Sequence, residues 1–231
     1  MSVVVLHVLC EGQTEERFAS SVLKPYLKEF GIVVKTTILT TNRKKRIRGG
    51  MLSYRQAKTD LELLMKQHAP KRYEQHFYTT MFDLYALPTD FPAYVRAHHA
   101  VDCYEVVQLL EDAFAQEMNH PRFIPYIQLH EFEALVFCGL DYLLDEYPDM
   151  KREIEHLKQV IKTSGDNTER INNTPQTAPS KRIIQAFEGK HHYDKPKLGV
   201  FVTHKVGIAT LKEKCPHFKK WIAELEQLGA S

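Results

Sequence analysis

The sequence predicts an α/β protein with a mostly parallel sheet of four strands, or slightly more, flanked by helices, and a helical C-terminal region. Short apolar runs rich in β-branched residues alternate with segments whose apolar residues recur at helical spacing, in the order β-α-β-α-β-α-β-α. The first run, residues 3–10, is apolar on both alternations, which is typical of a strand buried on both faces of a parallel sheet.

The first part of the chain, residues 1–139, is predicted to hold the α/β core. Its expected strands cover residues 3–10, 32–40, 76–82 and 123–129. Its expected helices cover residues 14–30, 54–68, 102–118 and 130–137, with Thr14 as the N-cap of the first. Residues 42–50 are basic and end in two glycines, and residues 83–92 contain prolines, so both segments are predicted to be loops.

Residues 140–231 are predicted to form a mainly helical extension that packs on the core as one structural unit. Helices are expected over residues 140–163, 179–188, 205–213 and 215–228, and residues 200–202 favour a short strand. The polar stretch 163–180 is expected to be a mobile loop.

Composition excludes several classes of protein. The 31 Lys and Arg residues nearly balance the 29 Asp and Glu residues, so only local charge clusters can indicate a partner. The four cysteines are isolated, which argues against a zinc ribbon or a disulfide framework and favours a reducing cytoplasm. Residues 2–10 lack the basic start of a signal peptide, and no apolar stretch approaches the roughly 20 residues of a membrane span.

Three of the four predicted strands end on carboxylates. Glu11 follows the first strand, Asp83 follows the third, and Glu131 and Glu133 follow the fourth. Sites in open parallel sheets form at the carboxyl ends of the strands, where these side chains are expected to meet. Carboxylates so close require protonation or a cation, and hard cations such as Mg²⁺ take oxygen ligands. The pattern favours metal-assisted phosphodiester cleavage, although each acidic residue alone could equally be a helix cap or part of a solvated rim.

The motif LCEGQTEERF resembles the opening motif of TOPRIM domains, especially those of the overcoming-lysogenization-defect (OLD) type nucleases. In those domains a hydrophobic strand ends in Glu-Gly, and a second acidic residue opens the helix. The segment MFDLYALP stands where TOPRIM domains have Asp-x-Asp, and IQLHEFEALVF stands where the OLD-type branch has a later acidic motif. Together with PSKRI and CPHFKKWIAELE, these segments are similar to an uncharacterised bacterial family of TOPRIM-like proteins over nearly the whole chain.

The resemblance implies roles for individual residues. Glu11 matches the TOPRIM glutamate, a metal ligand or general acid/base, Glu15 matches the second acidic residue, and Asp83 matches the first aspartate of Asp-x-Asp. Tyr85 stands where the second aspartate would be, which puts a two-metal mechanism in doubt. The implied catalytic residues are Glu11, Asp83, Glu131 and Lys205, and the implied ligands of Mg²⁺ or Mn²⁺ are Glu11, Glu15, Asp83, Glu131 and Glu133.

Basic residues near the predicted site could bind nucleic acid or supply a cation. Arginine suits phosphate geometry, but a solvated charge run is an equally good interpretation of the loop after the second strand. OLD-type nucleases use a lysine late in the domain, and Lys205 is the better positional match. His130 could orient a ligand or transfer a proton, or be a buried, hydrogen-bonded histidine. The candidate nucleic-acid-binding residues are Arg43, Lys44, Lys45, Arg46, Arg48, Lys181 and Arg182.

The function that the resemblance implies is a metal-dependent nuclease of TOPRIM type that acts in bacterial defence against phage. Its implied partners are DNA or RNA, an ABC-type ATPase and a second copy of the chain, in the cytoplasm and without a membrane. The alternative is a non-catalytic nucleic-acid-binding or regulatory subunit of an ABC-type ATPase complex, which the missing second aspartate favours.

Overall fold

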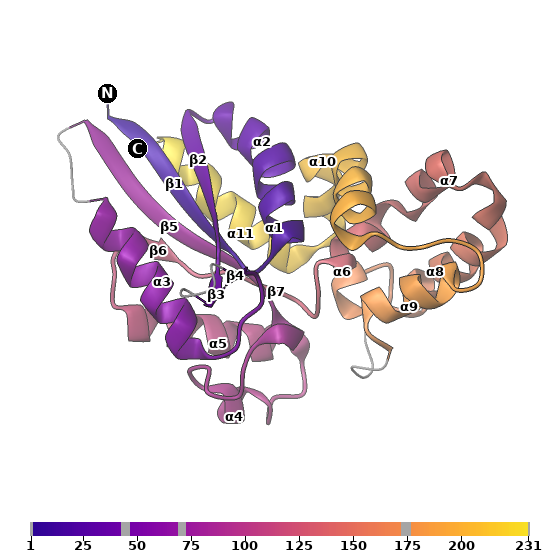
Figure 1. Cartoon of the computed structure of the whole chain (residues 1–231), viewed down its shortest axis with the longest axis horizontal. Helices are drawn as coiled ribbons and strands as arrows, with labels where there is room; N and C mark the ends of the chain where they lie inside the picture. The colour runs from indigo at the N-terminus through magenta and orange to yellow at the C-terminus, as the bar shows by residue number, and fades with distance from the viewer. Residues whose placement is uncertain (1, 43–46, 69–72, 172–176, 231) are drawn as a thin grey trace.

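A parallel sheet of five strands forms the centre of the fold (Figure 1). The structure is a computed structural model, and it describes residues 2–42, 47–68, 73–171 and 177–230. The strands are β1 (Val3–Cys10), β2 (Ile32–Ile38), β5 (Glu74–Asp83), β6 (Phe123–Ile124) and β7 (Ile127–Gln128). Their order is β2-β1-β5-β6, with β7 also paired to β5, and all these pairings are parallel. The predicted α/β fold is confirmed, with the first strand beside the third and the fourth following the third.

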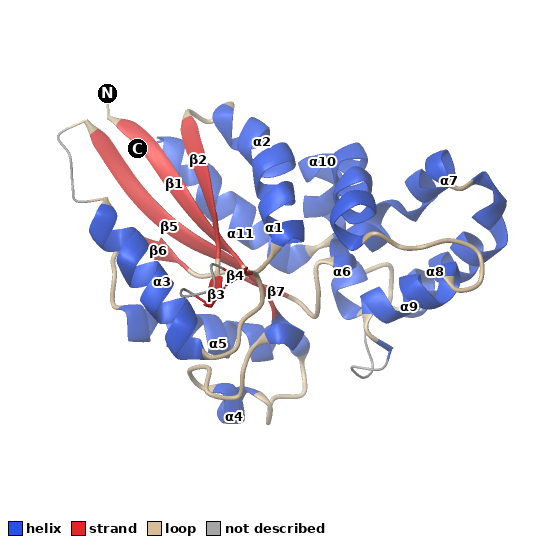
Figure 2. Ribbon diagram, in the orientation of Figure 1, coloured by secondary structure: helices blue, strands red, loops and turns tan. Residues whose placement is uncertain are grey.

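Helices cover both faces of this sheet (Figure 2). Alternate residues of a strand point to opposite faces, and β1 contributes to a separate hydrophobic cluster on each face. Val4, Leu6, Val8 and Cys10 belong to the cluster shared with the first and last helices. Leu9 belongs to the cluster beneath α3 (Tyr54–Gln67) and α5 (Cys103–Met118). The α-helices of the described residues are α1 (Gln13–Phe18), α2 (Lys24–Lys28), α3 (Tyr54–Gln67), α4 (Tyr94–Ala97), α5 (Cys103–Met118), α6 (Glu133–Val136), α7 (Leu143–Glu146), α8 (Lys151–Thr163), α9 (Pro179–Phe187), α10 (Val200–Lys214) and α11 (Pro216–Gln227).

The first helix runs from α1 into α2 through a π-helical turn at Ala19–Leu23. Its N-cap is Gly12 rather than the predicted Thr14, which lies buried in the first turn. The predicted strand 32–40 ends at Ile38. Residues 42, 47 and 48 of the predicted loop instead belong to two short strands, β3 (Thr40–Asn42) and β4 (Ile47–Arg48), which pair as an antiparallel hairpin.

The last part of the sheet and the following helices are more broken than the sequence predicts. Pro125 cannot donate to a strand ladder, and it separates β6 from β7. The predicted helix 140–163 is interrupted by 3₁₀ turns at Phe137–Tyr142 and Pro148–Met150 before α8 begins. In Figure 1, α7, α8 and α9 lie beyond the carboxyl edge of the sheet, away from the N-terminus.

The predicted short strand at residues 200–202 is wrong. These residues form the first turn of α10, which continues over the predicted helix 205–213 despite a kink at Gly207. The apolar β-branched run misled the prediction because Val202 is buried on a helix face rather than in a sheet. Within the described part of the chain, no helix is long and apolar enough to cross a membrane.

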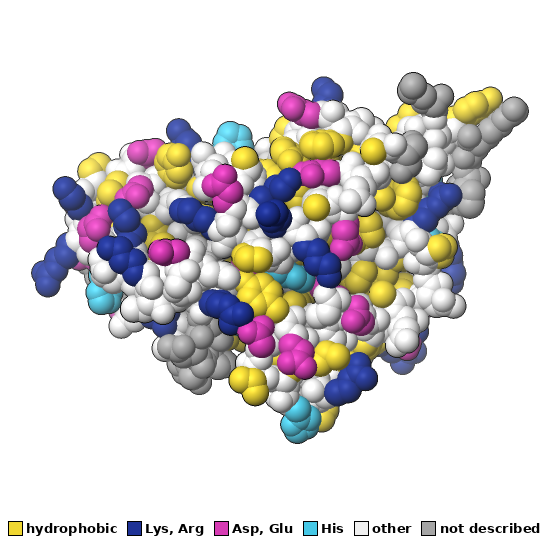
Figure 3. All heavy atoms as spheres, turned by 180° about the vertical axis from the view of Figure 1, so that it is seen from behind, with side chains coloured by type: hydrophobic (Ala, Val, Ile, Leu, Met, Phe, Trp, Pro, Cys, Tyr) yellow, Lys and Arg dark blue, Asp and Glu magenta, His cyan; other side chains and the backbone are white. Residues whose placement is uncertain are grey.

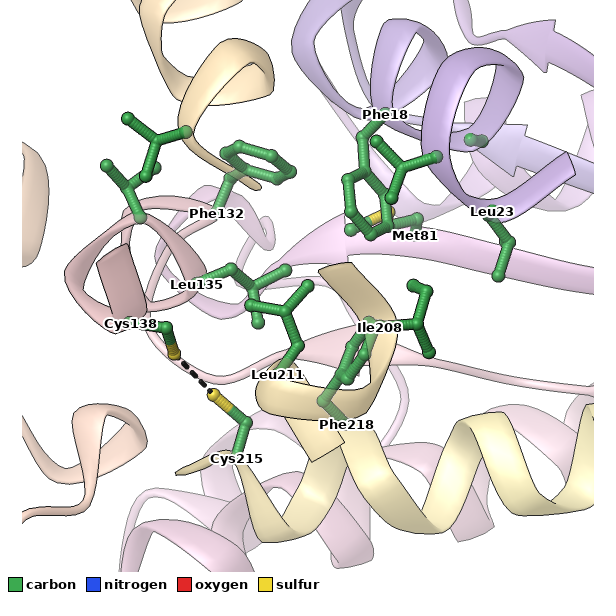
Figure 4. Packing of buried hydrophobic residues seen from close by; sticks show 14 of the residues in the cluster. Phe18, Leu23, Met81, Phe132, Leu135, Cys138, Ile208, Leu211, Cys215 and Phe218 are labelled. Carbon is green, nitrogen blue, oxygen red and sulfur yellow. Dashed lines mark hydrogen bonds between the residues drawn. The ribbon is translucent and has the colours of Figure 1, made fainter. Parts of the chain in front are cut away.

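The C-terminal helices α10 and α11 complete the core on one face of the sheet. Figure 4 shows Leu211 and Phe218 from these helices packed among Phe18 of α1 and Met81 of β5. Trp221 of α11 stacks on Tyr126 with ring centroids 4.0 Å apart, and its indole N–H donates to Thr79 Oγ1 at 2.9 Å. A buried hydrogen bond thus ties the last helix directly to the third strand of the predicted core.

We expect Trp221→Phe and Thr79→Val each to lower the free energy of unfolding by about 1–3 kcal/mol, since each leaves a buried polar partner unpaired. The double variant should lose clearly less than the sum of the two losses, because both partners are then absent. Urea unfolding of the four proteins measures this coupling. Strictly additive losses would show that the hydrogen bond contributes nothing.

Candidate active site

The ends of β1 and β5 bring Glu11 and Asp83 together. The two strands are parallel neighbours with Cys10 opposite Met81, so they end side by side. The backbone N–H of Asp83 donates to Glu11 Oε2 at 3.0 Å, and the backbone N–H of Glu11 donates to Met81 O at 3.1 Å. The predicted meeting of these residues at one sheet edge therefore follows from the strand register.

Glu15 lies one turn into α1 and faces the same edge. Its Oε2 accepts a hydrogen bond from the backbone N–H of Gly12 at 2.8 Å, and its side chain is buried. A Cβ atom at residue 12 would lie 3.2 Å from that oxygen, so glycine lets the carboxylate fold back closely onto the chain. The Glu-Gly pair thus serves the geometry of the helix start as well as the acidic cluster.

Lys195 supplies the cation that the carboxylates require. It opens the π-helical turn Lys195–Gly199, and its Nζ lies 3.0 Å from Glu133 Oε2 and 3.5 Å from Asp83 Oδ2. Sequence analysis missed this residue, because 112 positions separate it from Asp83 and its neighbours, Asp194-Lys195-Pro196-Lys197, look like a polar loop. Among the described residues this lysine bridges two buried carboxylates at the sheet edge.

The bridged carboxylates are deeply buried and only partly satisfied. The side chain of Glu133 is fully buried, and Asp83 is 6% exposed. In the part of the chain that the structure describes, Asp83 Oδ1 and Glu133 Oε1 have no hydrogen-bond partner. Buried carboxylate oxygens without partners are costly, so this cluster is poised to bind a proton or a further cation.

Burial dominates the acidity of the cluster. It raises the pKa of Glu11 and that of Glu133 to about 7, and it also raises the pKa of Asp83. Burial alone would lower the pKa of Lys195, but the carboxylates of Asp83 and Glu133 outweigh it and raise that pKa above its ordinary value. Lys195 is therefore charged at neutral pH, whereas Glu11 and Glu133 change their protonation state near neutral pH.

The donor chemistry of this cluster fits a hard divalent cation. Every donor is a carboxylate oxygen, the ligand that Mg²⁺ prefers, and two of those oxygens lack partners. Among the described residues, however, no three His, Cys, Asp or Glu side chains are already arranged around one point as ligands of a metal ion. Metal binding thus requires side chains to converge where Lys195 now makes its contacts.

Glu131 reaches the cluster from the end of β7 but has a partner of its own. Its Oε2 accepts a hydrogen bond from the backbone N–H of Ser180 at 2.9 Å, in the first turn of α9. Its charge also helps to raise the pKa of Glu11 and that of Glu133. Glu131 therefore joins the sheet edge to the helical extension.

His130 and Tyr85 border the site. His130 has a left-handed backbone with φ of 61°, and its carbonyl accepts from the N–H of Tyr85 at 3.1 Å. Burial lowers the pKa of His130 to about 4 and raises that of Tyr85 to about 12, so both are neutral at physiological pH. Among the described side chains, the buried His130 Nδ1 has no hydrogen-bond partner.

The predicted basic residues that the structure describes lie on three elements, β4, α9 and α10. Arg43, Lys44, Lys45 and Arg46 are outside the described residues, and only the backbone of Arg48 is described, in β4. The hairpin base is fixed at the site, because the N–H of Gly50 donates to Glu11 O at 2.9 Å and the N–H of Gly49 donates to Leu39 O at 2.8 Å. A Cβ atom on Gly49, whose φ is 96°, would lie 3.8 Å from Gly12 Cα.

Lys205 lies on α10 rather than in the acidic cluster. It is exposed, with its Nζ 5.6 Å from the centroid of the Phe201 ring. Lys195, ten positions earlier, is the lysine whose Nζ contacts the carboxylates of Asp83 and Glu133. Lys181 and Arg182 lie in the first turn of α9, directly after Ser180. Lys181 is exposed, and Arg182 donates from Nε to Thr177 O at 2.8 Å.

Comparison with known proteins identifies the family. A family model described as a domain of unknown function (DUF4276) matches residues 10–226, nearly the whole chain. The chain belongs to this family. No curated protein matches it.

Solved structures similar to this chain include C-terminal regions of OLD proteins. The region from Xanthomonas campestris pv. campestris is 16% identical, with a TM-score of 0.43, and the match covers 100% of this chain and 97% of that one. The region from Burkholderia pseudomallei is 14% identical, with a TM-score of 0.43, and the match covers 99% of each chain.

We expect Lys195→Met to destabilise the protein most above neutral pH. Breaking a buried ion pair costs about 3–5 kcal/mol, and we expect about 2–3 kcal/mol at pH 8 because Lys195 is 34% exposed. Glu11 and Glu133 have pKa values of about 7 in the folded state against an ordinary 4.5, so the folded protein binds more protons between those values. The contribution of these two groups to the free energy of unfolding therefore falls as the pH rises from about 4.5 to about 7.

Without the ammonium group these pKa values should rise further, so the loss in Lys195→Met should shrink at pH 5.5. Urea unfolding at pH 5.5 and pH 8 measures the difference. Lys197→Met, an exposed lysine of the same turn, is the matched control and should change little at either pH. A loss in Lys195→Met that is equal at both pH values would contradict this account of the cluster.

Proposed function

We propose that the chain is a metal-dependent nuclease of TOPRIM type that hydrolyses phosphodiester bonds. The observation that carries this proposal is the meeting of Glu11, Asp83 and Glu133 with Lys195 at the carboxyl edge of a parallel sheet. Sites form at such edges, and the motifs around Glu11 and Asp83 resemble those of TOPRIM domains. Acidic oxygens beside one fixed ammonium suit a reaction in which a phosphate gains negative charge.

Asp83 and Glu133 would hold the metal ion through their unpartnered oxygens, with Mg²⁺ or Mn²⁺ as the ion. When bound, the ion would polarise the phosphoryl group and lower the pKa of water. Glu15 and Glu131 each have one oxygen fixed by a backbone N–H, which suits them to orient the cluster.

Glu11 is the general base of this proposal. A pKa of about 7 allows its carboxylate to accept a proton from water near neutral pH. The Asp83 N–H fixes one of its oxygens at 3.0 Å, so the proton is taken up at a defined position. The ammonium of Lys195, held by Glu133, stabilises the negative charge that develops on the phosphoryl oxygens.

The nucleic acid is proposed to run from this edge along α9. Its first turn contacts Glu131 through Ser180, and Lys181 follows directly. The next residue, Arg182, lines a pocket of about 390 Å³ between α8 and α9 together with Arg152 of α8. Lys and Arg mingle with Asp and Glu over the face drawn in Figure 3, so a phosphate path depends on such local arginines rather than on one broad basic face.

A second candidate is a non-catalytic nucleic-acid-binding or regulatory subunit of an ABC-type ATPase complex. Lys195 favours it, because its ammonium already balances part of the charge at the position where a metal ion would bind. The tyrosine at position 85, in place of a second aspartate, points the same way. DNA or RNA as substrate, a role in phage defence, an ATPase partner and a homodimer are parts of the proposal that the sequence resemblance suggests.

We expect Glu11→Gln to lower metal-dependent cleavage by roughly 10²–10⁴-fold, the usual contribution of a general base. The amide keeps an oxygen for the Asp83 N–H but cannot accept the proton. The metal-free variant should melt at the same temperature or higher, since a repelling charge is removed. Wild type should gain stability with millimolar Mg²⁺, and the variant should gain less.

The matched control is Glu29→Gln, which makes the same charge change at an exposed position outside the site. Cleavage of single-stranded, duplex and transfer-RNA substrates and melting with Mg²⁺ or Mn²⁺ are the measurements. Absence of both cleavage and a metal-induced shift in wild type, with and without an ATPase partner, would decide for the non-catalytic candidate.

We expect Arg152→Gln and Arg182→Gln each to weaken nucleic-acid binding and to reduce the slope of log K against log salt by roughly 0.7–0.9, the contribution of one lost phosphate contact. Fluorescence anisotropy across a salt series gives the slope. Lys28→Gln, exposed at the end of α2, is the control and should leave it unchanged. Equal slopes for all variants would remove the α8–α9 pocket from the binding path.

A further inference from the structure

Two thiols meet at the junction between the core and the helical extension. Cys138 lies in the turn after α6, and Cys215 lies between α10 and α11. Their Sγ atoms are 3.4 Å apart although 77 positions separate them in the sequence (Figure 4). Both are buried, Cys138 being 5% exposed and Cys215 fully buried. The proposed nuclease chemistry uses neither thiol, so their close approach calls for its own explanation.

The surroundings distinguish the two sulfurs. Thr168 Oγ1 lies 3.3 Å from Cys138 Sγ and 3.1 Å from Cys215 Sγ, and Lys214 Nζ donates to Cys138 O at 2.9 Å. The hydrogen bond with Cys215 lowers the pKa of Cys138 against the effect of burial, and Thr168 and Lys214 act in the same direction. Burial raises the pKa of Cys215. Cys138 is thus the better thiolate of the pair.

We propose that Cys138 and Cys215 are a redox modification site that closes reversibly to a disulfide under hydrogen peroxide. The Cys138 thiolate attacks one peroxide oxygen, the O–O bond breaks, and the leaving hydroxide takes a proton to give water and a sulfenic acid. The Cys215 sulfur then attacks the Cys138 sulfur, the S–O bond breaks, and a second water leaves with the thiol proton. In total, two thiols lose two hydrogens and one peroxide becomes two waters.

The disulfide would act on the proposed active site through α6. Closing it draws the sulfurs from 3.4 Å to about 2.05 Å, so at least one of the two cysteine side chains must shift. Cys138 Sγ also hydrogen-bonds to Ala134 O at 3.9 Å, and Glu133, the partner of Lys195, is the residue before Ala134. This coupling rests on the proposed function, and we expect oxidation to lower cleavage several-fold through the displaced Glu133–Lys195 contact.

The test is made on the full chain, reduced first and then exposed to hydrogen peroxide. We expect a mass loss of two hydrogen atoms and a linked Cys138–Cys215 peptide in a non-reducing digest, both reversed by dithiothreitol. Cys138→Ser and Cys215→Ser should each abolish the linked peptide. Cys103→Ser, at a more exposed thiol on α5, is the matched control and should keep it. The oxidised form should melt several degrees higher, since the cross-link restricts the unfolded chain.

Wild-type protein that gains oxygen at a single thiol without forming the linked peptide would overturn the proposal. So would oxidation confined to Cys103. Because mass and melting are read on wild type, a serine variant that fails to fold does not affect the decision. A disulfide that forms in a protein without cleavage activity would support the redox site while the nuclease proposal fails, so the two can fail separately.

Discussion

The sheet edge depends on the ion pairs that Lys195 makes with Asp83 and Glu133. Two parallel strands and a helix place carboxylates there, and the register of β1 and β5 sets Glu11 beside Asp83. Burial makes each carboxylate costly as an anion, and their mutual repulsion adds to that cost. Among the described residues, the ammonium group of Lys195 opposes both effects, so a turn late in the sequence stabilises the acidic edge of the sheet.

The position of Lys195 in turn explains features of the C-terminal region. Its turn ends at Gly199, where a Cβ atom would lie 3.2 Å from both the Phe132 ring and the Tyr193 hydroxyl. Thr203 Oγ1 donates to Gly199 O at 3.0 Å, so the first turn of α10 fixes the same backbone. The packing of α10 thus also helps to hold Lys195 against the carboxylates.

The sequence could predict those structural features that depend only on residues close together in the chain. The end of a buried strand and the start of a helix are local features, so Glu11 and Asp83 could be placed at the carboxyl edge from their own segments. Lys195 could not, since its role depends on a contact across 112 positions and its local sequence is that of a polar loop. Residues 200–202 were predicted wrongly for the same reason, because only packing against α6 and the core shows that a β-branched run is helical.

The negative charge of the acidic cluster is only partly offset by the described positive charge beside it. Among the described side chains, Lys195 brings one positive charge to the four carboxylates of Glu11, Glu15, Asp83 and Glu133, so it offsets only part of their charge when all are ionised. Protons compensate the rest near neutral pH, because burial holds the pKa of Glu11 and that of Glu133 at about 7. A divalent cation that entered the cluster would displace those protons, and its affinity would then rise with pH. The same burial that makes the carboxylates costly as anions therefore favours their protonation, and Lys195 offsets part of the negative charge that remains.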